Sequence, residues 1–185
     1  ASPLGEIPTL NDTSGYDICM GGYANLAVLG QWANLPEVWK AFRVTDFRLP
    51  LYLHAHRPDN PPEPEPESLL LPDIGWSFLR SGQGLNAFHS MFDHGIHPSG
   101  HCMPQNLTFD MVCHGHHWIV NSGCAPHYCT YDEQNTWHST TKAANCIRID
   151  NQDIPPNIDS ELLEWTNHNG TVTVRGRHQG YPAVV

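Results

Sequence analysis

A run of prolines in the first half of the chain limits what these residues can form. Between Pro58 and Pro72 the sequence reads Asn60-Pro-Pro-Glu-Pro-Glu-Pro-Glu-Ser68. Proline fixes φ and carries no backbone N–H, so such a run can form neither a helix interior nor the interior of a sheet. The run therefore predicts an extended linker or surface crossing over residues 58–72, with separate structural units before and after it.

The sequence has a different character on the two sides of this linker. Residues 16–43 carry a loose apolar stripe at helical spacing, and Pro36 followed by Glu37 is a start signal for a second short helix. After the linker come short apolar runs bounded by Gly, Pro, Asn and Asp, which are typical of strands joined by turns. We therefore expect a short α-helical segment followed by a mainly β, antiparallel β-sandwich. The expected strands are 76–80, 85–92, 107–113, 118–120, 147–149, 162–166 and 171–175.

Charge and composition narrow the classes of function. Nine Lys and Arg against nineteen Asp and Glu give the 185 residues a net charge of −10, so we expect no phosphate-neutralising surface and no nucleic-acid partner. Hydrophobic residues make up 39% of the chain, which is too much for a disordered segment. No apolar run approaches the roughly 18 residues of a membrane span, so we expect none.

Cysteine and histidine are the residues here that most often bind metal. Six cysteines suit either a disulfide framework or buried reduced thiols, and the sequence leaves both open. The tract Cys113-His-Gly-His-His117 lies between two apolar runs, which predicts a hairpin tip over His114–His117, with adventitious metal binding as the alternative. The cysteines are Cys19, Cys102, Cys113, Cys124, Cys129 and Cys146.

Five short motifs between residues 72 and 150 carry a family resemblance. They are Pro72-Asp-Ile-Gly-Trp-Ser-Phe-Leu-Arg80-Ser-Gly, Phe92-Asp-His-Gly95, Gly100-His101 followed by Leu107-Thr-Phe-Asp-Met111, Trp118-Ile-Val-Asn121-Ser-Gly123, and Thr140-Thr-Lys-Ala-Ala-Asn145-Cys-Ile-Arg-Ile-Asp150. Their order and spacing resemble the central β-sandwich domain of the heparinase II/III-like polysaccharide lyases, a superfamily that includes the oligoalginate lyases.

The resemblance also implies a domain organisation. Residues 1–57 are similar to the last helices of the (α/α) toroid that precedes this sandwich, and residues 58–72 would be the proline-rich linker. Residues 73–185 would then be the first part of an antiparallel β-sandwich of the supersandwich type. We accordingly expect the sequence to be a fragment of a longer protein.

The resemblance implies a lyase that cleaves uronic-acid glycans, of the alginate or glycosaminoglycan type, by β-elimination. The C5 proton is removed and the O4-linked sugar leaves, so the site needs a base and an acid tuned near neutral pH. His101 matches the Gly-His of the family's loop and is the first catalytic candidate, and His127 and Tyr128 are the others. An ordinary loop residue is the alternative for each of the three.

Donors that neutralise the sugar carboxylate are the second requirement of this chemistry. Arg80, Asn106 and Asn121 are the candidate substrate-binding residues, because arginine and asparagine side chains donate hydrogen bonds. A surface ion pair is the alternative for Arg80. The expected partner is thus an anionic polysaccharide or oligosaccharide.

Many relatives hold a structural zinc ion through three ligands that resemble His101, the residue at Asn121 and the residue at Ala144. Zinc prefers imidazole, thiolate and carboxylate ligands, whereas this chain has an amide and a methyl group at two of the three positions. We therefore commit to no cofactor. Asn145 matches an asparagine of the family, and we expect it to fix its loop by hydrogen bonding to the backbone.

Two other functions stay open at this point. One is a non-catalytic carbohydrate-binding or structural β-sandwich module that has lost the site, as Asn121 and Ala144 indicate. The other is a secreted metal-binding protein rich in His and Cys. The resemblance favours a periplasmic or secreted location.

Overall fold

The computed structural model describes residues 67–82, 84–96, 103–122, 130, 132 and 134–181. The predicted helices within residues 1–57 lie outside these ranges, as do His101, His127 and Tyr128. No helical element in the described ranges has the length and apolar character needed to span a bilayer. The elements are β1 (Leu69–Leu71), β2 (Trp76–Ser81), η2 (Gly84–Asn86), β3 (Phe88–Asp93), β4 (Met111–Cys113), β5 (His116–Ile119), η3 (Gln134–His138), η4 (Thr141–Ala143), β6 (Ser160–His168) and β7 (Thr171–His178).

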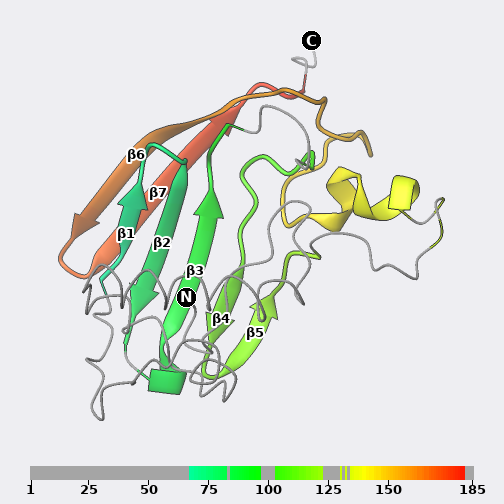
Figure 1. The fold of residues 1–185 in the computed structure, drawn as a ribbon. Coiled ribbons are helices and arrows are strands. Elements are labelled where there is room, and N and C mark those ends of the chain that lie inside the picture. Colours follow the sequence, from blue (N-terminus) through cyan, green and yellow to red (C-terminus); the bar gives the residue numbers. More distant parts are fainter. Residues whose placement is uncertain are drawn as a thin grey trace, which may run out of the picture.

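Strands β1 to β5 form one antiparallel sheet in which each strand pairs with its neighbour in sequence (Figure 1). The register of β2 and β3 places Trp76 opposite Asp93, Phe78 opposite Met91, and Arg80 opposite His89. Because side chains alternate between the two faces of a strand, these six side chains share one face of the sheet. The intervening Ser77, Leu79, Ser90 and Phe92 lie on the other face.

Two tight turns close the hairpins of the structure. His114 and Gly115 join β4 to β5, and Asn169 and Gly170 join β6 to β7; all four have positive φ, between 50° and 76°. Two-residue turns with positive φ at both positions match the right-handed twist of the strands. Gly at the second position adopts a positive φ without steric cost. These two dipeptides therefore set the register of both hairpins.

The β6–β7 hairpin packs against the five-stranded sheet. A Cβ atom at Gly176 of β7 would lie 2.5 Å from Leu107 Cδ2 and 3.2 Å from Phe92 Cε1, so glycine permits the close approach. Asn106 Nδ2 also donates to the Ile158 carbonyl (2.7 Å) and to Ser160 Oγ (2.8 Å) at the start of β6. The mainly β fold with an antiparallel β-sandwich is confirmed.

The structure moves several predicted strand boundaries. β1 lies within residues 58–72, so the sheet starts before residue 73, because Leu69–Leu71 follow the last Pro-Glu pair and are free to pair with β2. The predicted strand 85–92 begins only at Phe88, after the η2 turn. The predicted strands 107–113 and 147–149 shrink to β4 and to an isolated bridge at Ile149, since Leu107 and Asp150 adopt positive φ.

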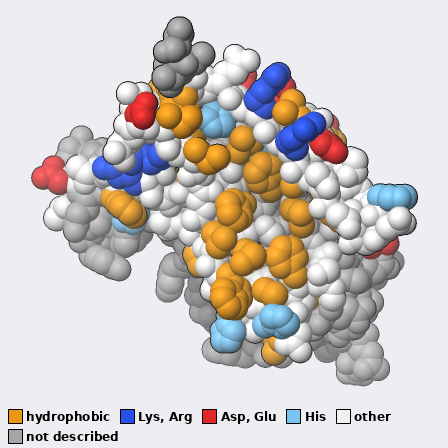
Figure 2. Space-filling view, turned by 180° about the vertical axis from the view of Figure 1, so that it is seen from behind, with side chains coloured by type: hydrophobic (Ala, Val, Ile, Leu, Met, Phe, Trp, Pro, Cys, Tyr) orange, Lys and Arg blue, Asp and Glu red, His pale blue; other side chains and the backbone are white. Residues whose placement is uncertain are grey.

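The interior of the described residues is unusually polar. Eleven buried side chains in these ranges are polar or charged, against five hydrophobic ones. On the surface, by contrast, Figure 2 shows a broad hydrophobic patch across the middle of one face, with charged side chains toward its margin. Buried polar groups require hydrogen-bond partners. Groups that have partners stabilise the fold, and groups that lack them are candidates for ligand binding.

Candidate functional site

Four neutral polar residues form a hydrogen-bonded group, here called the amide cluster: Gln105, Thr108, Asn121 and Asn145. Asn121 Nδ2 donates to Thr108 Oγ1 (3.1 Å) and to Gln105 Oε1 (3.4 Å), and the Asn145 backbone N–H donates to the same Thr108 hydroxyl (3.2 Å). Gln105 and Thr108 are fully buried and Asn121 is 3% exposed. A single hydroxyl thus accepts from two distant segments of the chain.

Backbone bonds complete the link between these segments. Ser122 Oγ donates to the Ala143 carbonyl at 2.8 Å, and Asn145 Nδ2 donates to the Phe109 carbonyl at 3.0 Å. The bond from Asn145 to backbone confirms the structural role expected for that residue. The turn before β4, the residues after β5 and the end of η4 are therefore held together.

The residues at the expected zinc position do not fit a zinc ion. Ala144 offers no ligand atom, and the Asn121 amide donates to two neutral oxygens of the amide cluster. Within the described ranges no group of three His, Cys, Asp or Glu residues is placed to hold a metal. His101 lies outside those ranges, and its possible part in a metal site stays a prediction.

The Phe92-Asp-His-Gly95 motif lies where β3 ends and β2 begins. His94 Nε2 and Ser77 Oγ lie 2.9 Å apart, and the His94 N–H donates to the Gly75 carbonyl at 2.7 Å. A Cβ at Gly75, where φ is +71°, would lie 2.0 Å from Gly95 Cα. Glycine is therefore required at both Gly75 and Gly95, because the two backbones approach each other closely there.

Arg80 and His89 form a second polar site, here called the Arg–His pair, in which His89 is buried and Arg80 is half-buried. They are partners on β2 and β3, and they share the sheet face with Phe78. The Arg80 guanidinium carbon lies 5.3 Å from the centre of the Phe78 ring, and the His89 ring centre lies 5.9 Å from it. His89 is only 2% exposed, yet neither ring nitrogen has a hydrogen-bond partner, and Arg80 Nε is also buried without one.

Burial controls the charge of this pair. Desolvation lowers the pKa of His89 to about 3, and the positive charge of Arg80 acts in the same direction. Burial also lowers the pKa of Arg80 below its usual value, although a guanidinium stays charged at neutral pH. The pair thus combines one cation with one neutral imidazole. A guanidinium can bind a carboxylate or sulfate oxygen, whereas His89, at 2% exposure, stays in the interior.

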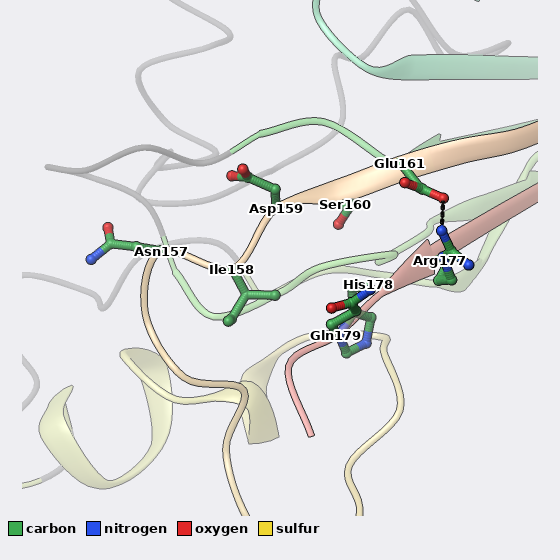
Figure 3. A pocket seen from close by; sticks show the side chains of 8 residues that line it. All are labelled: Asn157, Ile158, Asp159, Ser160, Glu161, Arg177, His178 and Gln179. Atoms are coloured by element: carbon green, nitrogen blue, oxygen red, sulfur yellow. Dashed lines mark ion pairs between the residues drawn. The ribbon is translucent and has the colours of Figure 1, made fainter. Parts of the chain in front are cut away.

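Asn106 supports a small polar pocket of about 300 Å³ at the start of β6 and the end of β7 (Figure 3). Its amide donates to Ile158 and Ser160 in the pocket wall. Arg177 and Glu161 form an ion pair at one side of the pocket, as the dashed line in Figure 3 shows. Asn106 itself is 4% exposed, so the pocket presents the residues that Asn106 positions.

The histidine tract is a hairpin, with one correction to the prediction. The tip consists of His114 and Gly115 alone, and His116 and His117 belong to β5, where they are exposed. The two-residue turn explains the difference, because Cys113 pairs directly with His116. Consecutive strand residues point to opposite faces, so His116 and His117 do not converge on one ion.

Cys113 and Cys146 carry free thiols, and burial raises the pKa of Cys146 to about 11. That thiol is therefore protonated and unreactive at neutral pH. The other four cysteines lie outside the described residues.

The structure places the three described substrate-binding candidates in different surroundings. Arg80 lies on β2 in the Arg–His pair, Asn121 lies in the amide cluster, and Asn106 anchors the pocket of Figure 3. Asn106 and Asn121 both adjoin the turn at residues 105–108, whereas no hydrogen bond joins Arg80 to either of them. Their predicted contacts with substrate stay predictions.

Sequence reasoning missed Gln105, Thr108 and His89. The contacts of Thr108 reach residues 13 and 37 positions away, and such long-range bonds leave no local signal. Alternation in β3 could have indicated His89, since it shares a face with Met91 and Asp93.

Comparison with known proteins first identifies the class of fold. One heparinase III gene product is 20% identical with a TM-score of 0.69, and the match covers 97% of this chain and 26% of that one. The heparan sulfate lyase HepC from Pedobacter heparinus is 19% identical with a TM-score of 0.69, covering 98% and 27%. The domain is thus a β-sandwich of the heparinase type, and the chain spans about a quarter of the length of these enzymes.

A family model then identifies the chain more closely. The model described as "Heparinase II/III-like, C-terminal" matches residues 63–185. The chain therefore belongs to this family, as the order of its motifs predicted. No curated protein matches the chain in sequence.

Proposed function

We propose that this chain is the β-sandwich portion of a polysaccharide lyase that cleaves uronic-acid glycans by β-elimination. Membership in the heparinase II/III-like C-terminal family, over residues 63–185, is the observation that carries the proposal. A periplasmic or secreted location suits an enzyme that meets an extracellular polysaccharide.

In this proposal His101, His127 and Tyr128 move the protons. One of them takes the C5 proton and another protonates the departing O4 oxygen, so each must lie within hydrogen-bond reach of its atom. Charge develops on the uronate carboxylate as the proton leaves, and Arg80 is proposed to stabilise it by donation. The Nδ2 groups of Asn106 and Asn121 each donate two hydrogen bonds within the fold, so these two residues are proposed to position their neighbours at the site.

The glycosaminoglycan type of substrate is the better supported of the two glycan types. Solved structures with this fold include a heparan sulfate lyase and heparinase III. The Arg–His pair adds support from this chain itself, because a half-buried guanidinium with an unpartnered Nε suits a carboxylate or sulfate group.

A non-catalytic carbohydrate-binding module is the second candidate function. Asn121 and Ala144 favour it, because the amide cluster now occupies the position of the expected metal ligands. Such a module would bind the glycan without cleaving it.

The test is the ultraviolet absorbance of the unsaturated uronate product. The complete protein is incubated with heparan sulfate and, separately, with alginate. We expect absorbance to rise with heparan sulfate, and His101→Ala to reduce the rate by about 100-fold or more, whereas His114→Ala in the exposed hairpin turn leaves it unchanged. Glycan binding with no rise in absorbance would select the non-catalytic module instead.

A further inference from the structure

The amide cluster occupies the place where the family resemblance puts a metal ion. Asn121 and Ala144 correspond to two of the expected ligands, and the bonds of Asn121 and Asn145 converge on the Thr108 hydroxyl. We propose that the hydrogen bonds of these neutral residues, from the Asn121 side chain and the Asn145 backbone N–H, replace the metal as the cross-link of this region, so that its fold needs no divalent ion.

The geometry supports this role because the cluster does what a structural metal does. A structural metal ties together segments that are distant in the chain. Thr108 Oγ1 joins the turn before β4 to Asn121 after β5 and to Asn145 after η4. The bonds from Ser122 to the Ala143 carbonyl reinforce the same junction.

The chemistry of the cluster disfavours a dication. Its side chains carry no charge, and a divalent ion there would lose its hydration shell without meeting a carboxylate, thiolate or imidazole from the cluster. Asn121 turns its N–H₂ group, which is a donor and not a metal ligand, toward the neighbouring oxygens. Mutual hydrogen bonding satisfies the Asn121 amide donor and the Thr108 hydroxyl, while Gln105 Nε2 is buried without a partner.

The position of the cluster in the sequence gives it a further consequence. His101 is four residues before Gln105, and His127 is six residues after Asn121. Both segments that carry predicted catalytic residues therefore leave from the cluster, and a rigid cluster fixes where each segment begins.

The experiment measures zinc content and thermal unfolding of the complete protein. We expect dialysed protein to hold far less than one zinc per chain, and its unfolding midpoint to be the same in excess chelator and in added zinc. Thr108→Val keeps the shape of the side chain but removes the hydroxyl, so it should lower the midpoint by roughly 3–10 °C.

Two variants serve as controls. Thr136→Val removes an exposed hydroxyl that donates to the Asp132 carbonyl at 2.6 Å, and it should leave the midpoint within about 2 °C of the wild type. If Thr108→Val does not fold, Thr108→Ser, which keeps the hydroxyl, should still fold. Stoichiometric zinc, a midpoint lowered by chelator, or equal effects of Thr108→Val and Thr136→Val would overturn the proposal.

Discussion

Two buried polar sites of this molecule differ in how their hydrogen-bonding groups are used. In the amide cluster, Thr108 and Asn121 bond to each other, and their partners come from three segments of the chain. In the Arg–His pair, Arg80 Nε and both ring nitrogens of His89 have no hydrogen-bond partner.

This difference separates a structural role from a binding role. Thr108 and Asn121 regain hydrogen bonds that they lost on leaving water, so they stabilise the fold, even though Gln105 Nε2 of the cluster is buried without a partner. An unpartnered buried pair destabilises the fold, and sites with that property concentrate where a protein binds or reacts. The amide cluster therefore belongs to the scaffold, and Arg80 in the Arg–His pair is the proposed ligand-binding group.

Loss of the Arg80 charge should give the largest effect. Arg80→Met keeps most of the volume but removes the charged donor, so the complete protein should bind a heparan sulfate oligosaccharide about 10- to 100-fold more weakly. Titration calorimetry measures the affinity. Arg175→Met is the control, because Arg175 on β7 is exposed and forms an ion pair with Glu164 on β6. Equal affinities for Arg80→Met and wild type would mean that Arg80 does not bind the glycan and has only a structural role.

The pH dependence of stability tests the burial of His89. Its pKa falls from 6.5 in the unfolded chain to about 3 in the fold, so below pH 6.5 the unfolded state binds a proton that the folded state does not. Stability should therefore fall by roughly 1 kcal/mol per pH unit as the pH drops from about 6 to 4, and His89→Leu should remove this component.

Urea unfolding at several pH values measures this effect. Met91→Leu, on the same strand and face, should keep the pH dependence of the wild type. An unchanged pH dependence in His89→Leu would mean that the imidazole is solvated, and the contrast between the two sites would then disappear.

Exposed ion pairs should give the smallest effect. Glu161 and Arg177 pair at the pocket of Figure 3 with side chains that are 51% and 55% exposed. Glu161→Gln should change the free energy of unfolding by less than about 1 kcal/mol, since water screens both charges. If urea unfolding shows that Glu161→Gln loses more than about 2 kcal/mol, an exposed polar pair stabilises the fold strongly. Burial would then not explain why the polar sites differ in their effect on stability.

The strands could be predicted where local signals were complete. Trp76–Arg80 alternates and ends at glycine, and β6 and β7 flank an Asn-Gly turn, so all three strands were found. The prediction 107–113 was too long, because Leu107 adopts a positive φ of 58° and Phe109 makes only an isolated bridge to Phe92. Both features depend on tertiary packing, which no sequence window contains.

The candidate site was less predictable than the fold. The backbone role of Asn145 followed from its place in a motif, and the bond to the Phe109 carbonyl confirms it. Gln105, Thr108 and His89 were missed, because their importance comes from contacts between segments and from burial. Alternation could predict the face that His89 occupies but not that its nitrogens would lack partners.

The absorbance assay with heparan sulfate tests the central claim most directly. The complete protein should produce unsaturated uronate, and His101→Ala should lose the activity while the exposed-turn variant His114→Ala retains it. An undiminished rate in His101→Ala, or no absorbance from any uronic-acid glycan that the protein binds, would contradict the assignment of this sandwich to an active lyase.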